Sequence, residues 1–339
     1  MKKSLYRLLH TLKAYRFFRL LHVRKFIILM YHGFTDREAH EGIENCQGKH
    51  LHIRKFEAQV KFLKENYNVI PLDQIIRSLR DGKKIPSWSV ALTFDDGYQS
   101  NYSLAFPILK QYRLPATVFL TTDFVDRKEL LWPDRVEYAV DKGRPLTGSE
   151  EDLLKESFAS KIRSELKDIP QESRLEKVEA LERRQGIKLS EEPHLREIYR
   201  PLSWEEISEM LQEGLVSIGS HTHTHVILSR CNTETIKGEL LLSKEIIEKR
   251  TGRVCDLFCY PNGEAKDFDR RTKMLLKETG YACALTTLPG FNDEHSDLFE
   301  LKRLGVRNQM DLAEFTMTLC GVKKFLSDAK RWVLGRRAC

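Results

Sequence analysis

The chain has 339 residues, of which 41% are hydrophobic and 31% are charged, and its formal net charge is +7. The apolar content is enough for a sizeable core, and the high charge is typical of long exposed helices. No run of about 18 apolar residues occurs, which excludes a membrane-spanning helix. Seven scattered cysteines without a Cys-x-x-Cys pair predict reduced thiols in a cytoplasmic protein, and no apolar secretory signal follows the basic start.

The two ends of the chain are basic. Residues 1–25 carry eight lysines and arginines and no acidic residue, and we expect a basic amphipathic segment there. Its apolar face is expected to consist of Leu5, Leu8, Leu9, Leu12 and Tyr15. A basic helical segment is also expected over residues 311–339. Two interpretations of the N-terminal segment stay open: it lies on an anionic membrane surface, or it is an ordinary helix packed on the folded domain.

Between these ends, short apolar runs alternate with helical patterns. Strands are expected over residues 26–32, 68–70, 89–94, 116–122, 216–221, 256–261, 281–287 and 300–307. Helices are expected over residues 53–67, 72–82, 99–112, 203–214, 233–250 and 267–279, the fourth opened by a Ser203–Glu206 capping box. This alternation predicts an α/β fold with a parallel sheet, and about seven such units favour a closed or nearly closed barrel.

Residues 127–199 break this alternation. They are rich in charge, with leucines at helical spacing, and predict a helical insertion that acts as a lid or spacer. Trp132, at its start, is a candidate contact for a substrate. The barrel itself is then expected over residues 26–126 and 200–310.

Two polar stretches follow predicted strands. Asp95 and Asp96 come directly after the strand at 89–94, and His221, His223 and His225 follow the strand at 216–221. The carboxyl ends of barrel strands meet on one face, so these side chains are expected to converge. One aspartate and two histidines suit a divalent cation with an open position, while an adjacent carboxylate accepts a proton. Taken singly, the two stretches also fit a solvated turn and a weak surface metal trap.

The stretches Thr93–Gly97 and His221–His225 resemble the Thr-Phe-Asp-Asp-Gly and His-[Ser/Thr]-x-x-His motifs of the polysaccharide deacetylase family, carbohydrate esterase family 4, with its NodB homology domain. The resemblance implies a distorted (β/α) barrel and a metal-dependent hydrolase that removes acetyl groups from sugars. It also implies that Asp96, His221 and His225 are metal ligands and that Asp95 is the catalytic base. His223 is left over, and we expect it to point elsewhere.

The chain departs from the family pattern at two motifs. In residues 258–263, Cys259 stands where the family has an arginine, and Asn262 stands where it has a tyrosine whose N–H holds the oxyanion. Asn262 can supply the same N–H. Arg303 is the candidate replacement for the missing arginine, the alternative being a surface arginine.

The family's C-terminal Leu-x-His motif is missing, since no histidine follows His295. His32, directly after the first strand, is the candidate general acid, the alternative being a buried structural histidine. Because a barrel is cyclic, its last strand can move to the start of the chain without moving the site. This arrangement is similar to that of permuted deacetylases acting on poly-N-acetylglucosamine, which have a Tyr-His near the start.

The sequence therefore predicts a metal-dependent hydrolase that removes an N-acetyl group from an amino sugar of a polysaccharide or lipid-linked saccharide. Zinc is the default metal for such ligands, with Mn²⁺, Co²⁺ and Ni²⁺ as alternatives. The alternative function is an inactive glycan-binding protein on the same barrel. The expected location is cytoplasmic, or peripheral on the inner face of the membrane, and no nucleic-acid partner is expected because no binding module is recognisable.

Overall fold

A computed structural model describes residues 2–127, 129–143, 151–188 and 197–323 of the chain. Helix α13 (Leu312–Leu319) begins the predicted C-terminal segment, but the basic residues after Lys323 lie outside the described part.

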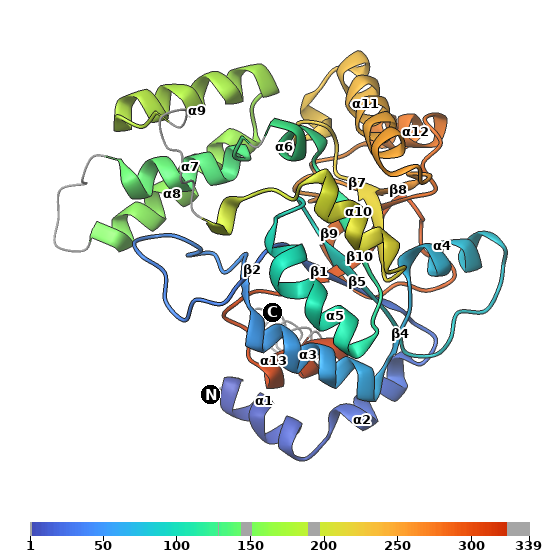
Figure 1. Cartoon of the computed structure of the whole chain (residues 1–339). Helices are drawn as coiled ribbons and strands as arrows, with labels where there is room; N and C mark the ends of the chain where they lie inside the picture. Colours follow the sequence, from blue (N-terminus) through green and yellow to red (C-terminus); the bar gives the residue numbers. More distant parts are fainter. Residues whose placement is uncertain (1, 128, 144–150, 189–196, 324–339) are drawn as a thin grey trace, which may run out of the picture.

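Seven parallel strands close into a barrel at the centre of the molecule (Figure 1). The sheet order is β1-β10-β9-β8-β7-β6-β5-β4, and β1 also pairs with β5, so that only β4 stays outside the closed ring. The ring consists of β1 (Ile27–Tyr31), β5 (Ser89–Phe94), β6 (Ala116–Leu120), β7 (Val216–Ser220), β8 (Leu257–Cys259), β9 (Cys283–Pro289) and β10 (Leu301–Gly305). The predicted distorted (β/α) barrel of about seven strands is confirmed.

The barrel closes between β1 and β5. Tyr31 lies beside Phe94, and Met30 lies beside Thr93. All six residues of β5 are buried, as expected for a parallel strand covered on both sides. The short β4 (Asn68–Val69) pairs only with the beginning of β5, and a separate two-stranded pair is formed by β2 (Phe34–Thr35) and β3 (Leu51–His52).

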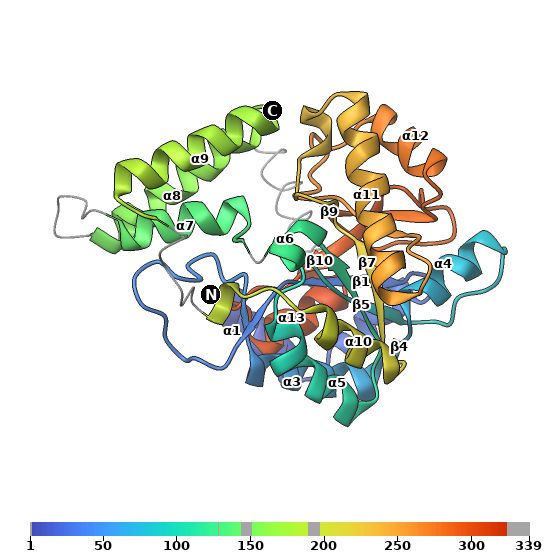
Figure 2. The same cartoon turned by 45° about the horizontal axis from the view of Figure 1, so that its top comes forward.

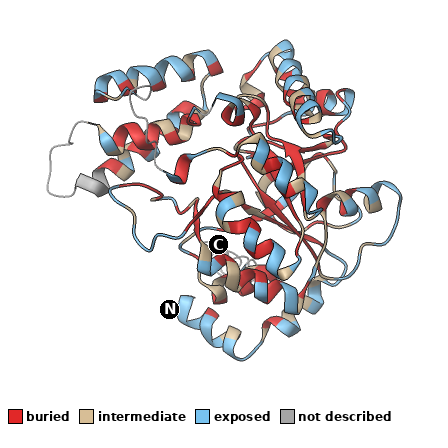
Figure 3. Ribbon diagram, in the orientation of Figure 1, coloured by how far each residue is buried: buried red, intermediate tan, exposed pale blue. Residues whose placement is uncertain are grey.

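Helices surround the barrel, and their outer faces are exposed while the strands are buried (Figure 3). They are α3 (Ile53–Asn66), α4 (Leu72–Arg80), α5 (Phe106–Tyr112), α6 (Thr122–Arg127), α10 (Trp204–Gln212), α11 (Thr233–Thr251), α12 (Arg270–Glu278) and α13. The predicted capping box of Ser203 and Glu206 is present at the start of α10. The helix predicted over residues 99–112 is divided: a π-helical turn at Asn101–Ala105 precedes α5, whose first turn accommodates Pro107.

Three helices between β6 and β7 stand to one side of the barrel in both views (Figures 1 and 2). They are α7 (Trp132–Lys142), α8 (Glu151–Lys167) and α9 (Gln171–Gln185). Their apolar side chains form a cluster of their own, in which Trp132 is 4% exposed and lies 5.3 Å from the guanidinium of Arg174. The suggestion that Trp132 contacts a substrate is therefore wrong, because its ring fills the core of this helical group.

The N-terminal segment lies against α13 and α3 (Figure 1). It comprises α1 (Lys2–Thr11), α2 (Tyr15–Phe18) and a short 3₁₀ turn at Arg19–His22. The expected apolar face is not continuous, because α1 ends at Thr11 and Lys13 has a left-handed φ of 54°. Tyr15 is consequently buried, whereas Leu8 and Leu12 are exposed. Among the residues that the structure describes, no helix combines the length and apolar composition needed to cross a bilayer.

Candidate active site

The predicted site residues meet at the carboxyl edge of the barrel. His32 follows β1 directly, and Asp95 follows β5 directly. Because Tyr31 pairs with Phe94, the next residues along the two strands are neighbours, and the Asp95 N–H donates to the Tyr31 carbonyl at 2.9 Å. The closure of β1 onto β5 therefore brings an N-terminal histidine beside the aspartate pair.

Asp96, His221 and His225 form a buried cluster of metal-ligating type. Asp96 Oδ1 lies 3.4 Å from Nε2 of His221 and 3.4 Å from Nε2 of His225. These separations match the edge of a tetrahedron, about 3.4 Å, when each ligand atom lies about 2.0–2.1 Å from a central ion. Asp96 Oδ1 is buried without a hydrogen-bond partner among the described residues, which leaves it available to a cation. The residues present therefore fit a divalent metal ion.

The surroundings keep Asp96 charged. Burial alone would raise the pKa of its carboxyl, but the imidazoles of His221 and His225 outweigh this and hold the pKa well below its ordinary value. His221 Nδ1 lies 2.8 Å from the Cys259 carbonyl, to which it donates in the neutral tautomer. That bond leaves Nε2 of His221 as the free ligand atom on the side of Asp96.

The backbone at this cluster is strained. Asp96, Thr222 and His225 have positive φ values of 76°, 66° and 57°, a region in which each non-glycine residue costs about 1–3 kcal/mol. Gly97 follows at φ 92°, and a Cβ on it would lie 2.9 Å from Leu120 Cδ2. Such strain is typical of functional sites, where the surrounding structure holds ligands in an unfavourable conformation.

Glu239, in α11, holds the histidine loop. Its carboxylate accepts hydrogen bonds from the backbone N–H groups of His223 and Thr224 at 2.8 and 2.9 Å. The His223 side chain turns away from the cluster, with Nδ1 2.8 Å from Thr122 Oγ1 and Nε2 3.6 Å from Asp123. The prediction that His223 points elsewhere is confirmed.

Arg303 forms a two-pronged ion pair with Asp95. Nη1 and Nη2 donate to the two carboxylate oxygens at 2.7 and 2.8 Å, and both side chains are almost fully buried. Nε of Arg303 donates to the Thr286 carbonyl at 2.8 Å, which fixes the plane of the guanidinium. Burial alone would raise the pKa of Asp95, but Arg303 overcomes this and lowers it. The alternative of a surface arginine is therefore wrong.

Cys259 also contacts the Asp95 carboxylate. Its Sγ is 3.7 Å from each carboxylate oxygen, and the residue is fully buried at the end of β8. The thiol therefore occupies space beside the base without supplying a charge. Arg303 reaches Asp95 from β10 instead, on the far side of β1.

His32 is half-buried at the same edge. Asn101 Nδ2 donates to its carbonyl at 2.7 Å, which ties the residue to the helix after β5. Burial lowers the pKa of the His32 imidazole, and the charges of Asp96 and Asp95 oppose that effect without overcoming it. The imidazole therefore lies within electrostatic range of both aspartates.

Asn262 adopts a left-handed conformation at φ 60°, directly after Pro261. Its carbonyl accepts a hydrogen bond from Thr287 Oγ1 at 2.7 Å. Its backbone N–H donates no hydrogen bond to any residue that the structure describes, and its side-chain Nδ2 is likewise buried without a partner there. The turn thus presents donors that are not used within the described chain.

Sequence reasoning missed a charged group beside these residues. Lys49, in the loop before β3, donates to Tyr98 and to Asp134, and Tyr98 donates to the other oxygen of Asp134. Burial would lower the pKa of Lys49, but Asp134 and the nearby Asp96 raise it, while the Lys49 charge helps to lower the pKa of His32. Nothing in the sequence indicates this network, because its members come from three separate segments.

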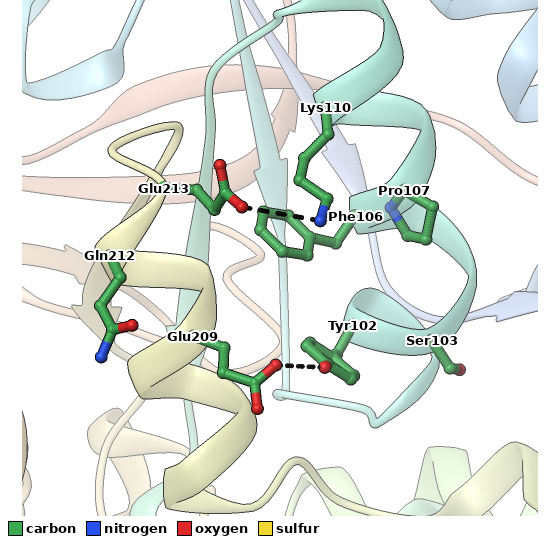
Figure 4. Close-up of a pocket in the computed structure, with 8 residues that line it drawn as sticks. All are labelled: Tyr102, Ser103, Phe106, Pro107, Lys110, Glu209, Gln212 and Glu213. Carbon is green, nitrogen blue, oxygen red and sulfur yellow. Dashed lines mark hydrogen bonds and ion pairs between the residues drawn. The ribbon is translucent and has the colours of Figure 1, made fainter.

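A hollow of ≈ 400 Å³ lies elsewhere, between α5 and α10 (Figure 4). Two polar pairs span it: Tyr102 donates to Glu209, and Lys110 Nζ lies 3.7 Å from Glu213. None of the predicted site residues lines it. The hollow is therefore separate from the cluster at the strand ends.

Comparison with known proteins finds relatives that are named as deacetylases. YxkH of Bacillus subtilis (strain 168), which carries a polysaccharide deacetylase name, is 24% identical over 294 residues, covering 86% of this chain and 75% of that protein. The poly-beta-1,6-N-acetyl-D-glucosamine N-deacetylase of Escherichia coli (strain K12) is 34% identical over 102 residues. That match covers 30% of this chain and spans only 14% of the Escherichia coli protein.

The fold agrees with a solved deacetylase. The structure of Streptococcus pyogenes deacetylase PplD in complex with acetate superposes with a TM-score of 0.59 at 19% sequence identity, covering 87% of this chain and 98% of that one. The family model described as polysaccharide deacetylase matches residues 82–284, which is more than half of the chain and includes both aspartates and all three histidines of the loop. The chain is therefore an enzyme of the polysaccharide deacetylase family.

Proposed function

We propose that this protein is a metal-dependent N-deacetylase that removes an acetyl group from an amino sugar of a polysaccharide or lipid-linked saccharide. The proposal rests on the different surroundings of two adjacent aspartates, Asp95 and Asp96. Asp96 faces two imidazoles, while Asp95 is turned toward the Arg303 guanidinium. One carboxylate is thus arranged to hold a cation, and the other remains a charged base beside it.

Asp96, His221 and His225 are the proposed ligands of a divalent ion, with zinc as the first choice. When bound, the ion supplies a Lewis acid that polarises the acetyl carbonyl and lowers the pKa of a coordinated water. The rest of the reaction is assigned to the chain's own side chains. Mn²⁺, Co²⁺ and Ni²⁺ remain alternatives because the ligand set alone does not select among them.

Asp95 is the proposed general base. It accepts a proton from the attacking water as the new carbon–oxygen bond forms at the acetyl carbonyl. Arg303 holds the carboxylate in one orientation and keeps it ionised, because the pKa of Asp95 is lowered by the guanidinium. Arg303 is therefore a positioning residue in place of the arginine that Cys259 replaces.

Asn262 and His32 are proposed to complete the reaction. The unused N–H of Asn262 donates to the oxygen that gains negative charge. His32 donates a proton to the amide nitrogen as the carbon–nitrogen bond breaks. The products are a free amino group and acetic acid, which loses its proton to water as acetate. Asp95 then releases the proton that it accepted, and His32 regains the one that it donated.

The proposed substrate class is a glycan of N-acetylglucosamine. Support comes from the Escherichia coli relative, whose name specifies a β-1,6-linked polymer of this sugar. The test is acetate release from short β-1,6- and β-1,4-linked N-acetylglucosamine oligomers by the metal-free protein, before and after addition of Zn²⁺ or Co²⁺. We expect acetate and amine to appear in equal amounts only after metal is added.

A protein that binds glycan oligomers but releases no acetate with any of the four metals would refute the proposal. That outcome would favour the alternative of an inactive glycan-binding barrel. Release of acetate from O-acetylated sugars alone would instead assign the site to an esterase.

A further inference from the structure

The outer surface of the N-terminal segment, residues 2–25, combines apolar and basic side chains. Seven of the eleven large apolar side chains that are exposed in the described chain belong to it: Leu5, Leu8, Leu12, Phe17, Leu20, Leu21 and Val23. Leu12 and Phe17 are the most exposed of these, at 68% and 67%. An apolar group of this kind on one short segment is typical of an interaction surface.

The same surface carries only positive charge. Residues 1–25 contain no acidic residue, and Lys3, Arg7, Lys13, Arg16, Arg24 and Lys25 are exposed. Arg7 pairs with Asp311 of the neighbouring helix at 3.1 Å. Within the described chain, Lys13, Arg16, Arg24 and Lys25 have no carboxylate partner. The surface therefore offers unpaired cations next to exposed leucine and phenylalanine side chains.

The segment is fixed on its inner side. Tyr15 is buried with its ring 5.1 Å from that of Phe62, and Arg19 stacks over Trp88 at 4.4 Å and donates to the Asn66 carbonyl at 2.6 Å. Tyr6 is also buried. The outer side chains are thus presented by a docked segment, and binding to them requires no new folding.

We propose that this surface, residues 2–25, docks on an anionic lipid bilayer. The charge disfavours a symmetric pair of chains joined through this surface, because two such faces would repel each other. Each lysine or arginine near an anionic membrane contributes attraction of about 1 kcal/mol, and exposed apolar side chains add insertion at the headgroup boundary. The proposal does not depend on catalysis.

The N-terminal segment lies along the barrel, so a membrane bound to it would be close to the active site. Arg7 contacts Asp311, which lies beyond the carboxyl end of β10, whereas Lys25 adjoins the start of β1. The segment therefore runs down one flank of the barrel, from its carboxyl edge to its amino edge. A membrane on this flank would lie next to the carboxyl edge of the barrel, which carries the site, and a lipid-linked saccharide could reach the site from there.

The test measures sedimentation of the full chain with vesicles of phosphatidylcholine alone or with about one third phosphatidylglycerol. The test variant is Arg16→Glu with Phe17→Ser. Its matched control is Arg253→Glu with Val254→Ser, which changes an adjacent pair of exposed basic and apolar residues elsewhere on the surface. We expect binding only to anionic vesicles, reduced at least about tenfold in the test variant and unchanged in the control.

A second pair, Leu12→Ser with Lys13→Asn, serves if the first destabilises α2, and asparagine suits the left-handed position of Lys13. Equal binding to both vesicle types, or equal loss in test and control variants, overturns the proposal. A dimer that depends on Phe17 without lipid binding would assign the surface to a second copy. Acetate release from soluble oligomers is expected to be the same in all these variants, so failure here is distinct from failure of the proposed activity.

Discussion

Replacing Arg303 by methionine tests how the proposed base, Asp95, is kept ionised. The guanidinium is buried and donates to both oxygens of Asp95, so Arg303→Met leaves a buried carboxylate without its cation. In the native protein the pKa of Asp95 is lowered, and the base is ionised throughout the usual assay range. In the variant, burial dominates, and the pKa of Asp95 rises.

The size of the effect follows from the pair's burial. Removing one member of a buried ion pair costs about 3–5 kcal/mol, and about 1.4 kcal/mol corresponds to one pKa unit. We expect a cost at the lower end of this energy range, because His221 and His32 still favour the Asp95 anion. The acidic limb of the kcat/KM profile should then move to higher pH by about two units. The loss of activity should therefore be larger near pH 5 than near pH 8.

The free energy of unfolding should also depend on pH through the Asp95 carboxyl. A lowered pKa of Asp95 stabilises the native protein above the ordinary carboxyl pKa, and this contribution disappears as the pH falls through the folded-state value. The difference in unfolding free energy between native protein and Arg303→Met should thus shrink as the pH is lowered. Denaturant titrations at several pH values measure it.

The matched control is Arg174→Met. Arg174 is also fully buried, but its guanidinium donates to the Leu166 and Ile169 carbonyls and to Gln171, with no carboxylate among these partners. The Arg174→Met variant should have a lower free energy of unfolding but an unchanged pH–rate profile. An unchanged acidic limb in Arg303→Met, with Asp95→Asn inactive, would refute the role given to the guanidinium.

Three further predictions concern neighbouring groups. Lys49→Met should move the alkaline decline of kcat/KM to higher pH, because the Lys49 charge lowers the pKa of His32, while Lys49→Arg should keep the native profile; a pH–rate series checks both. Glu239→Gln should weaken metal affinity about 10–100-fold, since it loosens the loop that carries two ligands, and competition with a chromophoric chelator measures this. Removal of metal by a chelator should lower the melting temperature, and adding Zn²⁺ should restore it, as read by calorimetry.

Much of the barrel is predictable because its strands are short, continuous apolar runs. The ends of β5 and β7 are marked by motifs, so the convergence of Asp95, Asp96, His221 and His225 follows from parallel strands alone. The position of His32 beside these residues follows from a closed barrel, in which the first strand can replace the last strand of the family's order. These predictions depend on local sequence and on one topological rule.

What could not be predicted depends on contacts between distant segments. The ion pair that Arg303 of β10 forms with Asp95, across β1, is one example. The sequence makes Arg303 only a candidate, because it does not show which side chains of β10 point inward. The Lys49, Tyr98 and Asp134 network has no local pattern at all. The prediction that Trp132 contacts a substrate is wrong for the same reason, because the core of the α7–α9 group is built from segments that the sequence shows only as amphipathic.

The domain boundaries, the cytoplasmic location and the metal itself stay predictions. Asp96 is proposed to hold a cation while its neighbour Asp95 acts as the base, and variants of these two residues separate the two roles. Bound metal and acetate release are determined on the same samples of Asp95→Asn and Asp96→Asn. We expect Asp95→Asn to keep about one ion per chain and to lose about 10²–10⁴-fold in rate, and Asp96→Asn to lose the ion. An Asp95→Asn protein that keeps both its metal and its full rate would refute the role of Asp95 as the base.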